Sequence, residues 1–258
     1  MQILEACDAL DGVKDGVMED PRRCSFNVDA LSLSATKRAV LKALYAPPTT
    51  RDGEIYPGQP FGGEGQTAGW PAWITGSTAP GGAPAPSLRF AFGTGIYKYF
   101  IANDPAWDYS HYDLNNWKKD AALSATFLNA TNPDLDAFKS KGGKLILWHG
   151  WADPALTALG SIRYFDEVKA RDAGAGDYFR MFLMPGVLHC GGGAGPDTAD
   201  WNTAIVNWVE QGSAPERIVA RQSDSNALPR TRPLCAYPKR AEYTGSGSID
   251  DEANFVCQ

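Results

Sequence analysis

Two side chains in the last third of the chain could form the acid–base pair of a nucleophilic hydrolase. Asp153 precedes Pro154, and His189 precedes Cys190. A carboxylate can orient an imidazole and stabilise its cation, while the imidazole takes a proton from an attacking hydroxyl. The alternatives are Asp153 as a helix N-cap before a proline at N1, a zinc pair at His189 and Cys190, and His149 as the base. Two adjacent ligands without a second cluster argue against zinc. His149 ends a strand-like run and is interpreted as a packing and hydrogen-bonding residue.

The segments around this pair alternate between strand-like and helix-like patterns. Short apolar runs favour buried parallel strands, and apolar residues at helical spacing favour amphipathic helices. The expected elements are a strand over 144–150, a helix over 155–172, a strand over 178–184 and a helix over 199–212. The expected inward-facing residues are Leu156, Leu159, Ile162, Phe165 and Val168 in the first helix, and Trp201, Ile205, Trp208 and Val209 in the second. Acid and base thus follow successive strands, as in the closing half of an α/β hydrolase.

The nucleophile of such a site is missing from the pattern. A hydrolase of this type carries its serine between glycines at positions −2 and +2, on a sharp turn between a strand and a helix. No serine in the sequence has both glycines. Ser25 is a weak alternative, because Phe26 and Asn27 follow it where small residues are required. We therefore expect the chain to hold an acid and a base without a nucleophile or oxyanion hole, and to be inactive alone.

An acidic, glycine-containing loop near the amino terminus could hold a hard cation. Asp8, Asp11 and Asp15 could supply carboxylate oxygens, and the carbonyls of Val13 and Val17 could complete the oxygen shell that calcium requires. The spacing is not that of an EF-hand. The alternative is an acidic surface turn, since aspartate and glycine are common in turns.

The five cysteines fall into two close pairs and one remainder. Cys7 and Cys24 are 17 positions apart, Cys235 and Cys257 are 22 apart, and Cys190 is left over. A disulfide in each pair would close a turn-rich loop and contribute about 3 kcal/mol in the chain-entropy model. Disulfides indicate an oxidising compartment, secreted or periplasmic. Reduced thiols in a cytosolic protein are the alternative, and the odd cysteine indicates a free thiol or a missing piece of chain.

The middle of the chain combines loop-forming and aromatic residues. A helix over 31–46 is expected to stop at Pro47-Pro48. The Gly/Pro-rich stretch 47–87 contains too many aromatic residues for a solvated linker, which favours a packed lid or substrate-binding loop. The dense aromatic residues of 88–117 could line a pocket for a flat ligand or form the core of a small helical subdomain. One or two short helices are expected over 118–140, and His111 is interpreted as structural.

Overall charge and hydropathy exclude some classes of protein. The chain has 24 Lys and Arg against 30 Asp and Glu, a net charge of −6, and therefore lacks the basic footprint of a nucleic-acid binder. The sequence contains no run of 18 apolar residues, so it predicts no membrane-spanning helix. Met1 is not followed by the basic and apolar regions of a signal peptide. The glycine loop 191–195 lacks the residues of a phosphate-binding motif.

Four ordered motifs resemble the second half of the tannase and feruloyl esterase family, which includes mono(hydroxyethyl) terephthalate hydrolases. They are CDALDGVKDG at 7–16, DPRRC at 20–24, HGWADP at 149–154 and HCGGG at 189–193. The resemblance implies a secreted enzyme with an incomplete α/β-hydrolase fold and a large calcium-binding lid insertion. Residues 1–140 would form the lid domain with its calcium loop, and residues 141–258 the carboxy-terminal part of the core.

The resemblance also implies roles for individual residues. Asp153 and His189 would be the acid and base of a Ser-His-Asp triad. Cys190 would lack its family partner, a cysteine just before the catalytic serine in an amino-terminal half that this sequence does not contain. The calcium ligands would be Asp8, Asp11 and Asp15 with the carbonyls of Val13 and Val17. The residues lining the acyl pocket would be Leu156, Phe92 and Tyr97.

We therefore expect a carboxylic ester hydrolase that acts on phenolic or aromatic acid esters once the missing half is present. Its expected cofactor is structural Ca²⁺, and its expected partners are a small aromatic ester and the amino-terminal half of the same fold. No nucleic acid or membrane partner is expected. The alternative is a non-catalytic, calcium-stabilised fragment that binds aromatic ligands.

Overall fold

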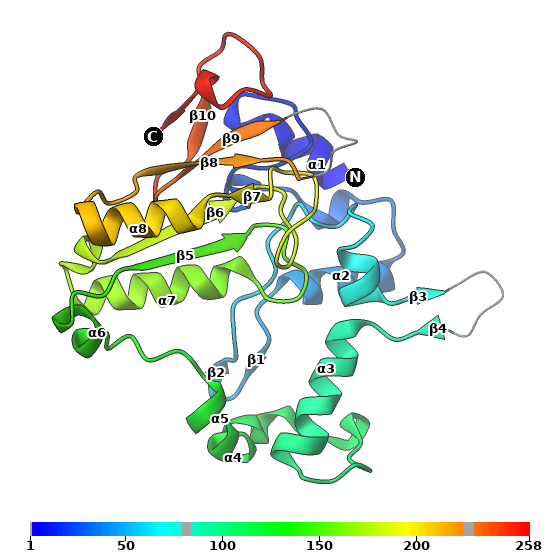
Figure 1. Cartoon of the computed structure of the whole chain (residues 1–258). Coiled ribbons are helices and arrows are strands. Elements are labelled where there is room, and N and C mark those ends of the chain that lie inside the picture. Colours follow the sequence, from blue (N-terminus) through cyan, green and yellow to red (C-terminus); the bar gives the residue numbers. More distant parts are fainter. Residues whose placement is uncertain (1, 79–83, 224–229) are drawn as a thin grey trace.

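The computed structural model describes residues 2–78, 84–223 and 230–258 of the 258-residue chain. A mixed α/β layer structure forms its carboxy-terminal part (Figure 1). The layer's elements are α6 (Asp136–Ser140), β5 (Leu145–Gly150), α7 (Ala158–Arg171), β6 (Phe179–Met184), β7 (Thr198–Ala199), α8 (Trp201–Gln211), β8 (Arg217–Arg221), β9 (Thr231–Cys235), β10 (Ala241–Tyr243) and β11 (Phe255–Cys257).

The centre of this layer is a parallel pair of strands with a helical crossover. β5 and β6 pair in parallel, from Leu145 opposite Phe179 to Gly150 opposite Met184, and α7 connects them. The predicted strand–helix–strand order is therefore confirmed, with bounds that differ by a few residues. Each strand leads into a loop at the same end of the pair, so the two loops that follow them lie side by side.

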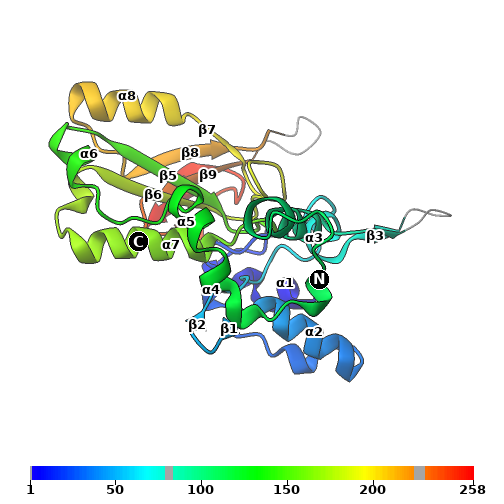
Figure 2. The same ribbon diagram turned by 90° about the horizontal axis from the view of Figure 1, so that it is seen from below.

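Helices cover both faces of the strand pair (Figure 2). The side chains of β6 alternate: Phe179 and Met181 pack with α7 residues such as Phe165, and Phe182 and Met184 pack with the group that includes α8. Alternation with apolar residues on both faces is what a covered parallel strand requires.

Two residues that were predicted to face inward, Val209 and Leu156, are exposed. Val209 of α8 is 60% exposed, because Trp208 occupies the inner face of the helix at 2% exposure. Leu156 precedes the first turn of α7 and is 63% exposed, whereas Ile162, Phe165 and Val168 are buried as expected. Strand β5 is mostly half-buried, because within the described residues it pairs on one edge only.

A three-stranded antiparallel sheet extends the layer beyond β6. β8 lies between β7 and β9, and an antiparallel bridge from Phe182 to Ala236 connects β6 to the chain that leaves β9. The hairpin of β10 and β11 closes the carboxy-terminal end. A disulfide between Cys235 and Cys257 ties β9 to β11, which confirms one predicted pair.

The amino-terminal segment packs against this carboxy-terminal end, as Figure 1 shows for the blue and red parts of the chain. Its elements are the helix α1 (Gln2–Cys7) and the 3₁₀ turn η1 (Asp8–Asp11). Val13 shares a buried cluster with Ala241 and Phe255. The second predicted disulfide, Cys7–Cys24, is also present and lies in a small core with Ile3 and Met18.

The remaining segments form an irregular region with short helices beside the layer. The helices are α2 (Ala35–Tyr45), α3 (Leu88–Ile96), α4 (Trp117–Asp120) and α5 (Ala122–Leu128), with π-helical turns at Pro71–Thr75 and Tyr97–Ile101; the strands are β1 (Thr49–Thr50), β2 (Gly53–Glu54), β3 (Ser77–Thr78) and β4 (Pro84–Ala85). The helices predicted within 31–46 and 118–140 are therefore present. No helix among the described residues is long and apolar enough to span a membrane.

Candidate active site

Asp153 and His189 come together at the ends of the parallel strands. The Nδ1 atom of His189 lies 2.9 Å from Oδ2 of Asp153. The other carboxylate oxygen, Oδ1, accepts hydrogen bonds from the backbone N–H groups of Ala155 at 2.7 Å and Leu156 at 3.0 Å. Because a carboxylate only accepts, Nδ1 of His189 is the donor, and Nε2 is the ring atom left for a reacting group. Asp153 is 4% exposed and the His189 side chain 35%, so the imidazole faces solvent while its partner is buried.

A close approach of two backbones brings the acid loop and the base loop together. The N–H of Ala152 donates to the carbonyl of Val187 at 3.0 Å, and the N–H of Trp151 donates to the carbonyl of Met184 at 2.9 Å. A Cβ atom on Gly150 would lie 2.3 Å from the same Val187 oxygen. Glycine is therefore required at the end of β5, because any side chain would push the loops apart.

His149 also contacts the carboxylate of Asp153. Its Nε2 lies 3.2 Å from Oδ2, the oxygen that His189 uses, and its Nδ1 lies 2.8 Å from the hydroxyl of Ser161 in α7. The interpretation of His149 as a hydrogen-bonding residue agrees with these contacts, although the sequence did not indicate that its partner would be Asp153.

Burial and hydrogen bonding act in opposite directions on the ionisation of Asp153. Burial raises the pKa of Asp153, but hydrogen bonds from His149 and His189 and from two backbone N–H groups outweigh it, so the pKa lies below its usual range. Asp153 is therefore an ionised carboxylate at neutral pH, as an acid that orients an imidazole must be.

Asp197 fixes the glycine-rich loop that follows His189. Its carboxylate accepts a hydrogen bond from the N–H of Gly192 at 2.7 Å and from both the hydroxyl and the N–H of Ser223, at 2.7 and 2.9 Å. Cys190 adopts a positive φ of 63° and is an exposed free cysteine. The loop therefore has a fixed turn at its centre and an exposed thiol beside His189.

Phe92 and Tyr97, both expected to line the acyl pocket, belong to two separate aromatic groups. Trp73 lies edge-on to His189, with 5.3 Å between ring centroids, and stacks on Phe92 at 5.9 Å. Tyr97 instead stacks on Trp107 at 4.8 Å and meets Tyr112 at 4.9 Å. Phe92 thus reaches His189 through Trp73, whereas Tyr97 belongs to a cluster within the lid.

Trp73 was one of many aromatic residues in the sequence, and no local signal marked it as the one beside the base. Leu156 was predicted to line the acyl pocket, and the structure places its backbone against Asp153 and His149 with its side chain exposed.

Two glutamine side chains of the irregular region form hydrogen bonds with the loops that carry Asp153 and His189. Gln59 is 7% exposed, and its amide donates to the carbonyl of Asp153 at 2.8 Å while accepting from Arg89 at 2.7 Å. Gln66 donates to the carbonyl of Gly186 at 3.1 Å and accepts from the N–H of Ala194. The irregular region is therefore hydrogen-bonded to both loops of the site.

The acidic loop packs on the carboxy-terminal strands, and its Val17 lies against Gly186 of the loop that carries His189. The carboxylate of Asp8 accepts from the N–H groups of Asp15 and Gly16, Asp11 accepts from Val13, and Asp15 pairs with the buried Arg232. Within the described part of the chain, no three His, Cys, Asp or Glu side chains converge as a metal-binding group.

The chemistry of the acidic loop nevertheless suits a hard cation. Burial raises the pKa of Asp11 to about 6 and that of Glu19 to about 8, and it also raises the pKa of Asp15 despite the neighbouring Arg232. Burial thus outweighs the two guanidinium groups that act on Asp15, those of Arg232 and Arg230. The donors are carboxylate and carbonyl oxygens, the ligand type that calcium prefers.

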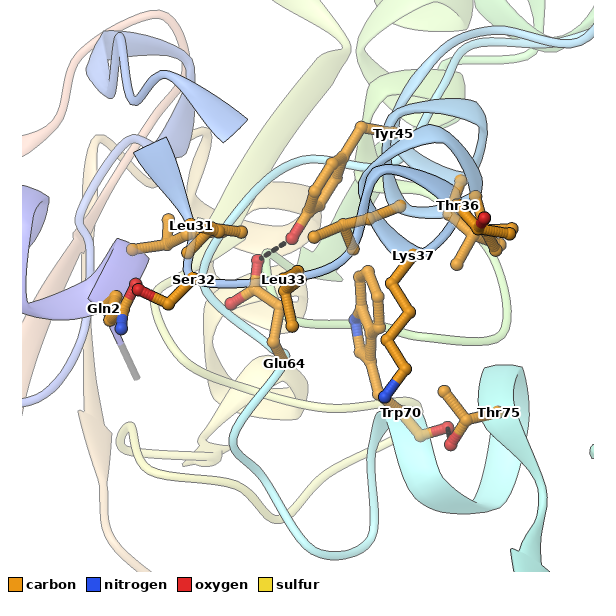
Figure 3. A pocket seen from close by; sticks show the side chains of 14 residues that line it. Gln2, Leu31, Ser32, Leu33, Thr36, Lys37, Tyr45, Glu64, Trp70 and Thr75 are labelled. Atoms are coloured by element: carbon orange, nitrogen blue, oxygen red, sulfur yellow. Dashed lines mark hydrogen bonds between the residues drawn. The ribbon is translucent and has the colours of Figure 1, made fainter. Parts of the chain in front are cut away.

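A hollow of about 550 Å³ in the irregular region does not include Asp153 or His189 (Figure 3). One face of α2, with Val40 and Leu44, forms one wall, and Trp70 and Glu64 lie opposite. Tyr45 donates a hydrogen bond to Glu64 at 2.9 Å. The hollow is lined mainly by apolar surface, and it contains no residue of the acid–base pair.

Comparisons with known proteins place this arrangement in context. The family model described as tannase and feruloyl esterase matches residues 1–258. The chain is 31% identical to a mono(2-hydroxyethyl) terephthalate hydrolase of Piscinibacter sakaiensis, over 99% of this chain and 50% of that protein. It is 34% identical to an uncharacterised esterase of Xanthomonas campestris pv. campestris, over 98% of this chain and 53% of that protein.

Solved structures match as well. The crystal structure of feruloyl esterase B from Aspergillus oryzae is similar, with a TM-score of 0.80 and 26% identity, covering 99% of this chain and 55% of that one. The tannin acyl hydrolase from Aspergillus niger has the same fold, with a TM-score of 0.76, 21% identity and coverage of 100% and 52%. The chain therefore spans about half the length of the relatives it matches.

Proposed function

The chain belongs to the tannase and feruloyl esterase family, and we propose that it supplies the acid and base of a serine carboxylic ester hydrolase. The hydrogen bond between Asp153 and Nδ1 of His189 is the observation that carries this proposal. It fixes the tautomer and leaves Nε2 directed away from the buried acid, as a general base requires. The serine would come from a part of the enzyme outside this chain, because none of the chain's serines has the expected glycine neighbours.

In the proposed reaction His189 acts twice. Its Nε2 takes the proton of the serine hydroxyl as the oxygen attacks the ester carbonyl, and the imidazolium then protonates the departing alcohol. Water attacks the acyl-enzyme in the second half, with His189 as base again, and the acid product leaves. Asp153 stabilises the imidazolium in both halves without being protonated itself.

An aromatic acid ester is the proposed substrate class. Trp73 lies edge-on to His189, and Phe92, stacked on Trp73, extends this aromatic surface. Flat rings gain contact area and stacking energy on such a surface, which an aliphatic acyl group would not. The relatives named for feruloyl and terephthalate esters are consistent with this class.

The amino-terminal half of the fold is the proposed partner within the enzyme. The outer edge of β5 has no partner strand among the described residues, so its N–H and C=O groups are available to another strand. Cys190, which is free and exposed next to His189, would bond a cysteine that precedes the serine. We propose no nucleic acid or membrane partner.

Calcium and an oxidising location complete the proposal. Asp8, Asp11 and Asp15, with the carbonyls of Val13 and Val17, would hold structural Ca²⁺, whose charge would offset that of the loop. The two disulfides support a secreted or periplasmic location, because such bonds persist in oxidising compartments.

Reconstitution with the missing half tests the function directly. The chain is co-expressed with an amino-terminal half that carries the serine, preceded by a cysteine, on its strand–helix turn. Hydrolysis of methyl ferulate and of mono(2-hydroxyethyl) terephthalate is then measured. We expect activity from the pair and none from the chain alone. His189→Ala should abolish it, by about 10³-fold or more, whereas the control His111→Ala should not, since His111 is an exposed lid residue. Binding of the esters without turnover by a correctly assembled pair would instead favour a non-catalytic aromatic-binding protein.

A further inference from the structure

Asp153 accepts hydrogen bonds from two imidazoles on the same oxygen. The Oδ2 atom lies 2.9 Å from Nδ1 of His189 and 3.2 Å from Nε2 of His149. The two histidines come from different elements, His149 from β5 and His189 from the loop after β6. The function proposed above uses only one of them.

The partners of His149 define its tautomer. Nε2 faces two acceptors, the Asp153 carboxylate and the carbonyl of Leu156, which is also 3.2 Å away. Nε2 must therefore carry the proton, and Nδ1 of the neutral ring accepts from the Ser161 hydroxyl at 2.8 Å. The ring is 14% exposed, so these contacts are largely shielded from water.

The geometry points to His149 as a positioning residue that donates Nε2–H to Asp153 Oδ2, oriented by Ser161, and keeps the buried acid ionised for His189. This inference rests on the function proposed above. Among the described residues, the carboxylate of Asp153 has four donors: two backbone N–H groups on Oδ1 and two imidazoles on Oδ2. The two imidazoles are the titratable groups that contact its carboxylate. A buried carboxylate that lost one of these donors would be protonated more easily, and a neutral acid would stabilise the His189 cation poorly.

The electrostatics of Asp153 agree with this role. Burial is the largest influence on the pKa of Asp153 and raises it, and the hydrogen bond from His149 is the largest of those that lower it, ahead of the bond from His189. Both histidines therefore favour the ionised form of the acid.

Two substitutions separate hydrogen bonding from packing. His149→Phe keeps the ring volume and removes the donor. His149→Gln loses the ring but places an amide N–H near the position of Nε2. A donor role predicts that Gln resembles the native residue and Phe does not, whereas a packing role predicts the opposite order.

The experiment measures the titration of the Asp153 carboxyl carbon by NMR in the 258-residue chain. We expect His149→Phe to move the Asp153 midpoint upward by about one pH unit, and His149→Gln to leave it near the native value. His111→Phe is the matched control, because His111 also contacts an aspartate and a serine, Asp108 and Ser110, here both through Nδ1, but is exposed. It should not affect Asp153. An unchanged midpoint in His149→Phe, or equal shifts in both His149 variants, would overturn the inference.

A measurement on the unmodified chain covers the case in which a variant does not fold. Imidazole nitrogen spectra at pH 8 should identify neutral His149 as the Nε2–H tautomer, and the Nδ1–H tautomer there would overturn the inference. Neither readout requires esterase activity. The inference can therefore fail while the reconstituted enzyme is active, and it can hold in an inactive one.

Discussion

Gly150 and Val187 approach so closely that a Cβ atom on Gly150 would lie 2.3 Å from the carbonyl oxygen of Val187. Gly150 ends the strand that leads to Asp153, and Val187 lies two residues before His189. The contact therefore sets the separation of the two loops that hold the acid and the base. The N–H of Ala152 donates to the same Val187 oxygen, which keeps that atom from moving away freely.

Gly150→Ala should destabilise the chain and loosen the Asp153–His189 contact. Overpacking at a site with no room typically costs about 1–3 kcal/mol, and urea unfolding measures the loss. Gly160→Ala is the matched control: it lies inside α7, where a Cβ would meet only Thr157 at 4.0 Å. Alanine there should stabilise the helix by up to about 1 kcal/mol. Equal stability of the two variants would contradict this account of Gly150.

Asp153→Asn should lower the free energy of unfolding at pH 7 by about 1–3 kcal/mol. The NH₂ group of asparagine would replace a carboxylate oxygen that accepts hydrogen bonds, and it would face N–H groups that are themselves donors. The pKa of Asp153 is lowered in the folded chain. The stability that the ionised carboxylate adds is therefore fully present above its pKa in the unfolded chain, about 4. This stability is lost as the pH falls through the lower pKa of the folded chain.

The stability gap between the native chain and Asp153→Asn should thus narrow between pH 7 and pH 3, as measured by urea unfolding at both values. Asp166→Asn, on the exposed side of α7, is the control and should leave stability nearly unchanged. A gap of the same size at both pH values would mean that the ionised carboxylate is not what stabilises the site.

The local order of the site was predictable from the sequence, and its contacts were not. Apolar runs and helical spacing specified β5, α7 and β6, and therefore the position of Asp153 and His189 at one end of the strands. The partner of His149 depends on the ring's orientation, which Ser161 and Leu156 set and no periodicity encodes. Trp73 reaches His189 because an irregular lid segment folds back on the loop, a long-range contact without a sequence signal. Val209 was misplaced because the neighbouring Trp208 takes the inner face of a short helix.

Loss of the Cys235–Cys257 disulfide should destabilise the carboxy-terminal hairpin and the acidic loop packed on it. The double substitution of both cysteines by serine should cost about 3 kcal/mol for a loop of this length, measured by urea unfolding. Cys190→Ser is the control, because Cys190 is exposed and free. The prediction fails if the double-serine variant unfolds at the same urea concentration as Cys190→Ser and the native chain.

Trp73→Leu should reduce preference for aromatic acyl groups in the reconstituted enzyme. Removing the ring beside His189 should lower kcat/KM for methyl ferulate by about 3- to 10-fold and leave that for an acetyl ester nearly unchanged. Trp107→Leu is the control, since Trp107 stacks on Tyr97 within the lid. Equal losses for both esters would show that Trp73 supports the loop and does not contact the acyl group.

Removal of calcium should destabilise the chain if the acidic loop holds the ion. Binding to the folded state alone stabilises by about 2.7 kcal/mol when the ion is present at 100 times its Kd. A chelator should therefore lower the melting temperature, and added Ca²⁺ should restore it. Asp11→Asn should remove this response because it deletes a charged ligand, whereas Asp166→Asn should keep it. Magnesium at the same concentration should restore less of the lost melting temperature, because it demands a smaller, more regular shell of ligands. A chain whose melting temperature is the same with chelator and with calcium, or an Asp11→Asn variant that responds like the native chain, would exclude this loop as the calcium site.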